Sequence, residues 1–181
     1  MKPTDTLRHE HQVIEMVLDA AQDEIERMSH TGKVDPDRLR QFVEFFRFFA
    51  DRCHHAKEEE YLFERLKERG LPADQGPIGV MLYEHEEGRK HIRGLEDGIE
   101  NAAAGQEPAV RAVREHLQDF VDLLRSHISK ENNILFVMAD QLLTDRDQRE
   151  LEEAFERVEA QEIGPDVHER YHQLAHQLAG R

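Results

Sequence analysis

Residues 54–63 read HHAKEEEYLF, and residues 127–136 read HISKENNILF. The two stretches share a histidine, then Lys-Glu from the third position after it, then Leu-Phe, and they begin 73 positions apart. A Glu-His dipeptide at 10–11 recurs at 84–85 with almost the same offset, 74 positions. The chain thus contains twice a unit in which a single histidine precedes a His-x-x-x-Glu motif by 42 or 43 residues.

The segments around these motifs have the composition and periodicity of long α-helices. Charged residues make up 35% of the 181-residue chain, which has three tyrosines and no tryptophan. Abundant Glu, Arg, Leu and Ala with few β-branched or aromatic runs favour helix. Glycine and proline mark the breaks between helical patterns. The predicted helices cover residues 4–30, 36–69, 77–104, 108–141, 145–161 and 166–179.

Inward-facing residues recur in alternating steps of four and three, for example Leu7, His11 and Ile14 in the first helix. Such stripes pack helices side by side, and short connections make sequential helices antiparallel. We therefore predict an all-α protein. It comprises an up-down-up-down four-helix bundle over residues 1–143 and a helical extension over residues 144–181 that packs on the bundle.

The overall composition excludes several classes of function. A net charge of −15 repels nucleic acid and anionic membrane surfaces, so we expect neither as a partner. The chain has no apolar stretch near twenty residues and no signal-peptide pattern, which predicts a cytoplasmic location. A single cysteine, Cys53, excludes an internal disulfide and a cysteine-based zinc cluster. No feature of the sequence fixes the oligomeric state.

Polar residues interrupt the helical stripes at six inward-facing positions. They are His11, His54, Glu58, His85, His127 and Glu131. A buried carboxylate without a partner is costly, and two of them among four imidazoles need compensating charge. Histidine and glutamate four residues apart lie on one face of a helix, so both reach one centre. Two divalent cations, each with two imidazoles and with both glutamates bridging, would satisfy the set.

Two simpler interpretations stay open. In a glutamate-rich chain with twelve histidines, a His-x-x-x-Glu spacing arises easily by chance, and a core-facing histidine is commonly only hydrogen-bonded. The repeat is also compatible with duplication of an inert helical hairpin whose ionisable residues pair with one another. Four core-facing histidines at matched spacing favour the metal interpretation over both.

The ligand types select among metals. Zinc prefers four ligands, often with sulfur, whereas imidazole and carboxylate at higher coordination suit iron or manganese. Six protein ligands with bridging carboxylates leave positions open on two octahedral ions, and these positions admit dioxygen, peroxide or nitric oxide. We therefore predict two metal ions, with iron preferred over manganese.

The ordered motifs resemble a known family. The matching segments are EHQVI at 10–14, CHHAKEEEYLF at 53–63, MLYEHEEGR at 81–89 and HISKENNILF at 127–136. They span nearly the whole predicted bundle, and as a set they resemble the hemerythrin-like proteins of the HHE cation-binding family. The resemblance implies a non-haem di-iron centre with an oxo or hydroxo bridge and two bridging carboxylates, held by the six residues above.

The chain departs from the oxygen-carrying hemerythrins at two positions. Those proteins have a second histidine on the third helix where this chain has Arg89, and an aspartate pattern on the fourth helix where it has Glu131. One ligand is thus missing relative to the carriers, which argues against reversible oxygen transport. His55 and His168 are candidates to replace it, although on an ideal helix His55 is turned by about 100° from its neighbour and would then hydrogen-bond outside the cage.

These features predict a di-iron protein that binds or processes O2, peroxide or nitric oxide in an oxidative or nitrosative stress response. Its enzymatic form is catalase-like peroxide disproportionation. One alternative is an oxygen or iron sensor that uses residues 145–181 as its output segment. Another, by resemblance to iron-centre repair proteins, is an iron donor.

Overall fold

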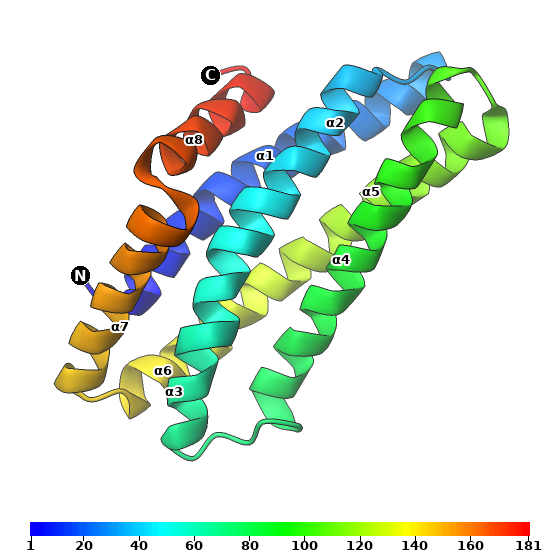
Figure 1. The fold of residues 1–181 in the computed structure, drawn as a ribbon. Coiled ribbons are helices and arrows are strands. Elements are labelled where there is room, and N and C mark those ends of the chain that lie inside the picture. The colour runs from blue at the N-terminus through cyan, green and yellow to red at the C-terminus, as the bar shows by residue number, and fades with distance from the viewer.

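The computed structural model describes the backbone of residues 1–181 and the side chains of all residues except 162. Over this backbone the chain is helical and contains no strand, which confirms the all-α prediction (Figure 1). The elements are α1 (Pro3–Thr31), α2 (Pro36–Phe45), η1 (Phe46–His55), η2 (Glu58–Leu62), α3 (Phe63–Glu68), α4 (Gly76–Ala103), α5 (Glu107–Lys130), η3 (Glu131–Leu135), α6 (Phe136–Leu142), α7 (Asp145–Arg157), η4 (Val158–Ile163) and α8 (Pro165–Ala179).

Consecutive elements join into four long rods: α1, α2 to α3, α4, and α5 to α6. The rods run side by side and alternate in direction along the chain (Figure 1). Breakers set their ends as the sequence predicts. Gly32 ends α1 with φ 66°, in the left-handed region that favours glycine. Asp35 caps α2 by accepting a hydrogen bond from the Arg38 amide, with Pro36 in the first turn.

Four segments, labelled η, are π-helical and were not predicted. Three of them, η1, η2 and η3, lie inside the second and fourth rods and hold His54, Glu58 and Glu131, whereas His127 lies in the last turn of α5. A π-helical turn closes hydrogen bonds between residues five apart instead of four, and such turns occur frequently at functional sites. The wider turn reduces the rotation between consecutive residues, so neighbouring side chains can share the inner face.

The core consists of two apolar clusters separated by a polar layer. The larger one contains Ile14 and Phe46, and the smaller one contains Leu7 and Phe136. His11 lies in the sequence between Leu7 and Ile14 and is 1% exposed. The predicted ligands therefore occupy a buried layer between two well-packed ends of the bundle.

The last helices, α7 and α8, lie along the outside of the bundle, close to α1 (Figure 1). The Arg38 guanidinium on α2 donates to the Leu178 carbonyl at 3.1 Å. Asp147, at the start of α7, accepts hydrogen bonds from Arg65 and Arg69 at the end of the second rod. The boundary at residue 143 stays a prediction. Among the described residues, no helix combines the length and apolar character needed to cross a bilayer.

Candidate metal centre

The structure brings all six predicted ligands together in the polar layer. Each has a side chain that is at most 1% exposed: His11, His54, Glu58, His85, His127 and Glu131. The first and third rods supply one histidine each, and the second and fourth supply a His-x-x-x-Glu pair each. His55, one of the two additional candidates, joins them and is 6% exposed.

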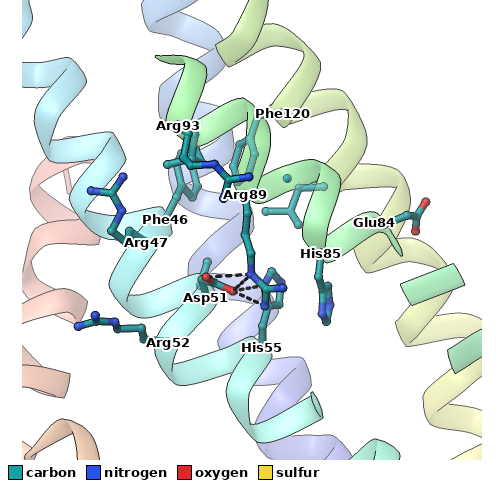
Figure 2. Close-up of a pocket in the computed structure, with 14 residues that line it drawn as sticks. Phe46, Arg47, Asp51, Arg52, His55, Glu84, His85, Arg89, Arg93 and Phe120 are labelled. Atoms are coloured by element: carbon teal, nitrogen blue, oxygen red, sulfur yellow. Dashed lines mark hydrogen bonds and ion pairs between the residues drawn. The ribbon is translucent and has the colours of Figure 1, made fainter. Parts of the chain in front are cut away.

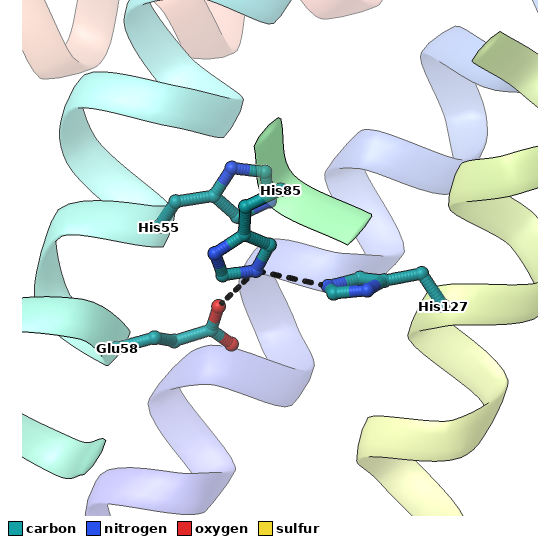
Figure 3. A group of neighbouring side chains, drawn as sticks. All are labelled: His55, Glu58, His85 and His127. Atoms are coloured by element: carbon teal, nitrogen blue, oxygen red, sulfur yellow. Dashed lines mark hydrogen bonds and ion pairs between the residues drawn. The ribbon is translucent and has the colours of Figure 1, made fainter. Parts of the chain in front are cut away.

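The side chains form two groups of four. His11 and His54 gather with both glutamates, and the ligand atoms lie within 4.8 Å of one another. We call this group the inner cluster. His55, Glu58, His85 and His127 form the second group within the same limit (Figure 3), which we call the cavity-side cluster. Glu58 belongs to both.

Each glutamate faces one histidine of each cluster. Glu58 Oε1 lies 3.3 Å from His54 Nε2, and its Oε2 lies 3.3 Å from His85 Nε2. Glu131 Oε2 lies 3.1 Å from His11 Nε2, and its Oε1 lies 3.0 Å from His127 Nε2. Two carboxylates that each point one oxygen at either cluster have the arrangement of ligands that bridge two cations.

Hydrogen bonds do not account for this arrangement. Both oxygens of Glu58 and of Glu131 are buried and accept no hydrogen bond of normal geometry from the described groups, and His11 Nε2 and both nitrogens of His54 likewise lack one. Leaving charged buried groups unsatisfied costs several kcal/mol each. His85 Nε2 and His127 Nε2 are 3.0 Å apart, close to the roughly 3 Å between two nitrogens bound to one octahedral ion at about 2.1 Å. The donor set therefore fits metal ions.

The outward nitrogens of the imidazoles face acceptors. His11 Nδ1 is 2.7 Å from Asn132 Oδ1, and His85 Nδ1 is 2.9 Å from Glu59 Oε1. His127 Nδ1 is 3.1 Å from an oxygen of Glu84. A metal-ligating histidine usually donates its second N–H to such a group, which fixes the tautomer and leaves Nε2 for the ion.

These outer contacts repeat with the same offset as the motifs. Glu10 lies 3.5 Å from His54 Nδ1 and accepts from Lys57 at 2.7 Å. Its counterpart Glu84 contacts His127 and Lys130. The Glu59–His85 contact corresponds in the same way to Asn132–His11. The duplication therefore extends beyond the ligands to the groups that orient them.

Residues 2–139 match the family model of the hemerythrin HHE cation binding domain. The chain belongs to this family. Similar curated proteins include the "Iron-sulfur cluster repair protein YtfE" of Escherichia coli O157:H7, 29% identical over 134 residues, and that of Escherichia coli O81 (strain ED1a), 30% identical over 134 residues. Each match covers 73% of this chain and 60% of the relative, so the chain spans less than two thirds of their length. No solved structure is significantly similar to the chain.

His55 breaks the symmetry of the hemerythrin-like centre. By the 73-residue offset its counterpart is Ile128, a core residue that is 2% exposed. The His55 ring stacks on His85 with 3.8 Å between centroids, and its Nδ1 is 3.2 Å from Asp51 Oδ1. Burial and the neighbouring His85 lower the pKa of His55 to about 3, which keeps the ring neutral, as metal binding requires. The hydrogen bond to Asp51 does not exclude it from the cavity-side cluster.

Arg89, which replaces a histidine of the oxygen carriers, takes no place in either cluster. Its guanidinium binds Asp51 and Glu59, with N–O distances of 2.9 to 3.1 Å. Those two carboxylates in turn contact His55 and His85. Arg89 therefore fixes the acceptors of two candidate ligands from the outside.

The second additional candidate, His168, lies outside both clusters. Its Nε2 is 3.8 Å from Glu159, and its ring lies 5.7 Å from that of Phe49. Glu159, from η4, contacts the ammonium group of Lys57, which is fully buried. His168 therefore belongs to the interface between the last helices and the bundle.

The carboxylates and imidazoles of the layer shift one another's pKa values toward the charged forms. Burial alone would lower the pKa of His54, but the facing carboxylates of Glu58 and Glu10 raise it to about 10. The pKa of His85 is raised in the same way, against burial, by the carboxylates around it. The pKa of Glu131 is lowered well below its usual value, against burial, by the imidazoles. Cations that enter the layer would replace the imidazole protons.

Proposed function

We propose that this hemerythrin-like chain binds two iron ions and that the pair binds or processes a small exogenous ligand, O2, peroxide or nitric oxide. His11 and His54 would hold the inner ion. His55, His85 and His127 would hold the cavity-side ion, and Glu58 and Glu131 would bridge the two. The observation that carries the proposal is the pair of buried glutamates whose four oxygens accept no hydrogen bond of normal geometry from the described groups.

The donor set favours iron. Five imidazoles and two carboxylates without sulfur suit iron more than zinc, and manganese remains the alternative metal. When bound, the iron pair would supply open coordination positions and a change of oxidation state. The chain's own groups would hold the imidazoles in one tautomer through Glu59, Glu84 and Asn132 and exclude bulk water through the two apolar clusters.

Metal quantitation with an absorption spectrum tests the proposal. The purified chain should contain two iron ions, absorb in the near-ultraviolet, and gain a visible band when azide occupies an open position. Glu58→Ala should lose both ions, because this carboxylate belongs to both clusters. Exposed Glu115→Ala is the matched control and should retain them. A folded wild-type protein free of iron and manganese after loading would contradict the proposal.

The relatives favour a second candidate, donation of iron to a damaged iron centre, because the curated relatives are named as iron-sulfur cluster repair proteins. The two functions differ in what becomes of the metal. A donor would transfer iron to an apo acceptor protein and release little oxygen from peroxide. Peroxide-dependent oxygen release with the iron retained would instead select the catalase-like form.

A further inference from the structure

Three charged side chains, Glu10, Lys57 and Glu159, join the inner cluster to the C-terminal segment, residues 144–181. We call them the charged row. Glu10 lies 3.5 Å from Nδ1 of His54, a candidate ligand of the inner ion. Both carboxylate oxygens of Glu10 accept hydrogen bonds from the Lys57 ammonium group, at 2.7 and 3.2 Å. The same ammonium group donates to Glu159, which comes from η4. Three successive contacts therefore connect the C-terminal segment with a candidate ligand.

Apolar side chains of the C-terminal segment close over the charged row. Phe155 and Val158 are at most 2% exposed, and the Phe155 ring lies with its centroid 5.8 Å from the Lys57 nitrogen. Lys57 is fully buried, so its charge is balanced by carboxylates instead of water. Undocking of the segment would remove one of these carboxylates, Glu159, and open the ammonium group to solvent.

The charged row is an addition to the repeated frame. Lys130, the counterpart of Lys57, contacts Glu84 and is 36% exposed, so water also solvates its charge. Glu159 lies beyond residues 2–139, which match the family model. The third member of the row is thus supplied by a segment that follows the hemerythrin-like domain.

The cavity-side cluster has a different neighbourhood. A cavity of about 300 Å³ lies between η1 and α4, and His55 and His85 form part of its wall (Figure 2). Arg89, at the same wall, pairs with Asp51 and Glu59 from the second rod. Of the described residues, none from the C-terminal segment lines this cavity. Contact with that segment therefore distinguishes the inner cluster from the cavity-side cluster.

We propose that Glu159 is a positioning residue for the inner ion and that it couples docking of the C-terminal segment to binding of that ion. With Glu159 in place, two carboxylates share the charge of Lys57, and Glu10 keeps negative charge facing His54. A negatively charged acceptor at the second nitrogen orients an imidazole and strengthens it as a ligand. Without Glu159, the ammonium group would be balanced by Glu10 alone, and less of that negative charge would act on His54. The inference rests on the proposed function, because it assigns a regulator to the inner ion.

Coupling of this kind acts in both directions. If the docked segment raises the affinity for the inner ion by a given factor, the bound ion stabilises docking by the same factor. We expect about fivefold, at the lower end of couplings between sites, because three contacts separate Glu159 from His54. The cavity-side ion should respond little, since His54 belongs to the inner cluster alone.

Chelator competition on the full-length, iron-loaded Glu159→Gln variant tests the inference. The substitution keeps the size of the side chain and removes its charge. The affinity for the inner ion should fall about fivefold, and the affinity for the cavity-side ion should be nearly unchanged. The release step that His55→Ile does not shift identifies the inner ion. Glu156→Gln removes the same charge from an exposed position of α7 and should shift neither step. An unchanged inner ion in Glu159→Gln, or equal weakening of both ions, would overturn the inference.

Hydrogen–deuterium exchange at Val158–Ile163 separates coupling from simple attachment of the segment. In the wild type, iron loading should slow exchange there about fivefold, because the ion stabilises docking. Glu159→Gln should exchange faster than the wild type and should no longer respond to iron. A residue that only attaches the segment would change exchange by the same factor with and without iron, and that result would overturn the coupling.

A double substitution tests the route through the ammonium group. If the coupling passes through Lys57, adding Glu159→Gln to Lys57→Met should cause no further loss of affinity for the inner ion. Additive losses would overturn the route. Glu159→Gln and its control Glu156→Gln decide the matter if Lys57→Met fails to fold.

The wild-type chain distinguishes a failure of this inference from a failure of the proposed function. A folded wild type that takes up neither iron nor manganese would contradict both. Two bound iron ions, together with exchange at Val158–Ile163 that ignores them, would support the metal proposal and overturn the coupling alone.

Discussion

The inner cluster and the cavity-side cluster repeat the same kinds of ligand and orienting group, but they differ in what surrounds them. On the inner side, Lys57 is fully buried and sits between Glu10 and Glu159 from the C-terminal segment. On the cavity side, its counterpart Lys130 is 36% exposed and contacts Glu84 alone among the described carboxylates. The inner end is thus sealed by the C-terminal segment, and the other end opens into a cavity lined by His55.

The difference shows how a duplicated hairpin can acquire two chemical environments without losing its symmetry. The ligands and their orienting acceptors repeat, so both halves are built to hold an ion. Single positions that do not repeat, such as His55 with its sequence counterpart Ile128, determine how many ligand side chains each cluster has and which cluster borders the cavity. The inner ion would therefore be the structural partner, and the cavity-side ion the one that meets exogenous ligands.

The largest expected effect is on stability, and it should differ between the Lys57 and Lys130 variants. Lys57→Met leaves Glu10 and Glu159 without their buried cation, which should lower the free energy of unfolding by about 3–5 kcal/mol. Lys130→Met removes a partly exposed pair and should cost at most about 1 kcal/mol. Urea unfolding followed by circular dichroism measures both. Equal losses would show that the C-terminal segment does not seal the inner side.

His55→Ile makes the cavity-side half match its repeat. Loss of this imidazole should lower the affinity for one of the two ions by about 100-fold, at the upper end of the effects seen for groups around metal sites. The affinity for the other ion should be nearly unchanged. Competition with a coloured chelator should then show two separate release steps. Ile128→Val is the matched control. Unchanged release of both ions would exclude His55 as a ligand.

A substitution of Asp147 tests how the C-terminal segment, residues 144–181, is attached to the bundle. Hydrogen bonds from Arg69, Arg65 and Thr144 hold the pKa of its carboxyl well below the usual range, although burial opposes this. A carboxyl with a lowered folded-state pKa stabilises the fold fully above its unfolded pKa, near 4, and less as pH falls below that value.

Asp147→Asn should therefore cost about 1–2 kcal/mol at pH 7. Its effect should shrink in urea titrations at pH 3 and below. Exposed Asp37→Asn, whose contact with Arg40 is at the surface, is the control. A cost for Asp147→Asn that stays constant with pH would rule out a charge effect.

The smallest effect is expected at Arg89. Arg89→Met removes the guanidinium that holds the carboxylates of Asp51 and Glu59. These carboxylates then orient His55 and His85 less firmly. Because the arginine is one contact further from the ion than the groups whose loss costs 10–100-fold, we expect less than about tenfold weaker iron binding. Chelator competition should show this loss on the cavity-side ion alone. An equal loss at both ions would contradict the assignment.

Sequence periodicity was sufficient for the rods, whose ends agree with the predicted ranges within two residues, because glycine and proline fix helix ends locally. The π-helical turns were not predicted. The spacing of apolar residues does not show whether an amide binds the carbonyl four or five residues before it. For the same reason His55 could not be placed from an ideal helix. Its position three residues before Glu58, which puts the two on one helical face, was the available signal.

The burial of Lys57 could not be predicted either. Its partner Glu159 lies 102 residues away, and the sequence indicates neither the face on which the last helices dock nor which charges they cover. His168, a candidate ligand by sequence because it opens the last helix, contacts Glu159 at this same junction. Contacts between charged helix faces that are far apart in the sequence leave no periodic pattern of residues from which they could be predicted.

The wide turns of η1, η2 and η3 also bear on where the bundle opens. Each interrupts the regular ladder of amide bonds beside the polar layer, on the second and fourth rods, so we expect local opening to be easier there than at the apolar ends. Ions that bind all four rods would act as a clamp on that layer. Hydrogen–deuterium exchange should then slow on iron loading at residues 46–62 and 131–135, and stay constant at the apolar ends.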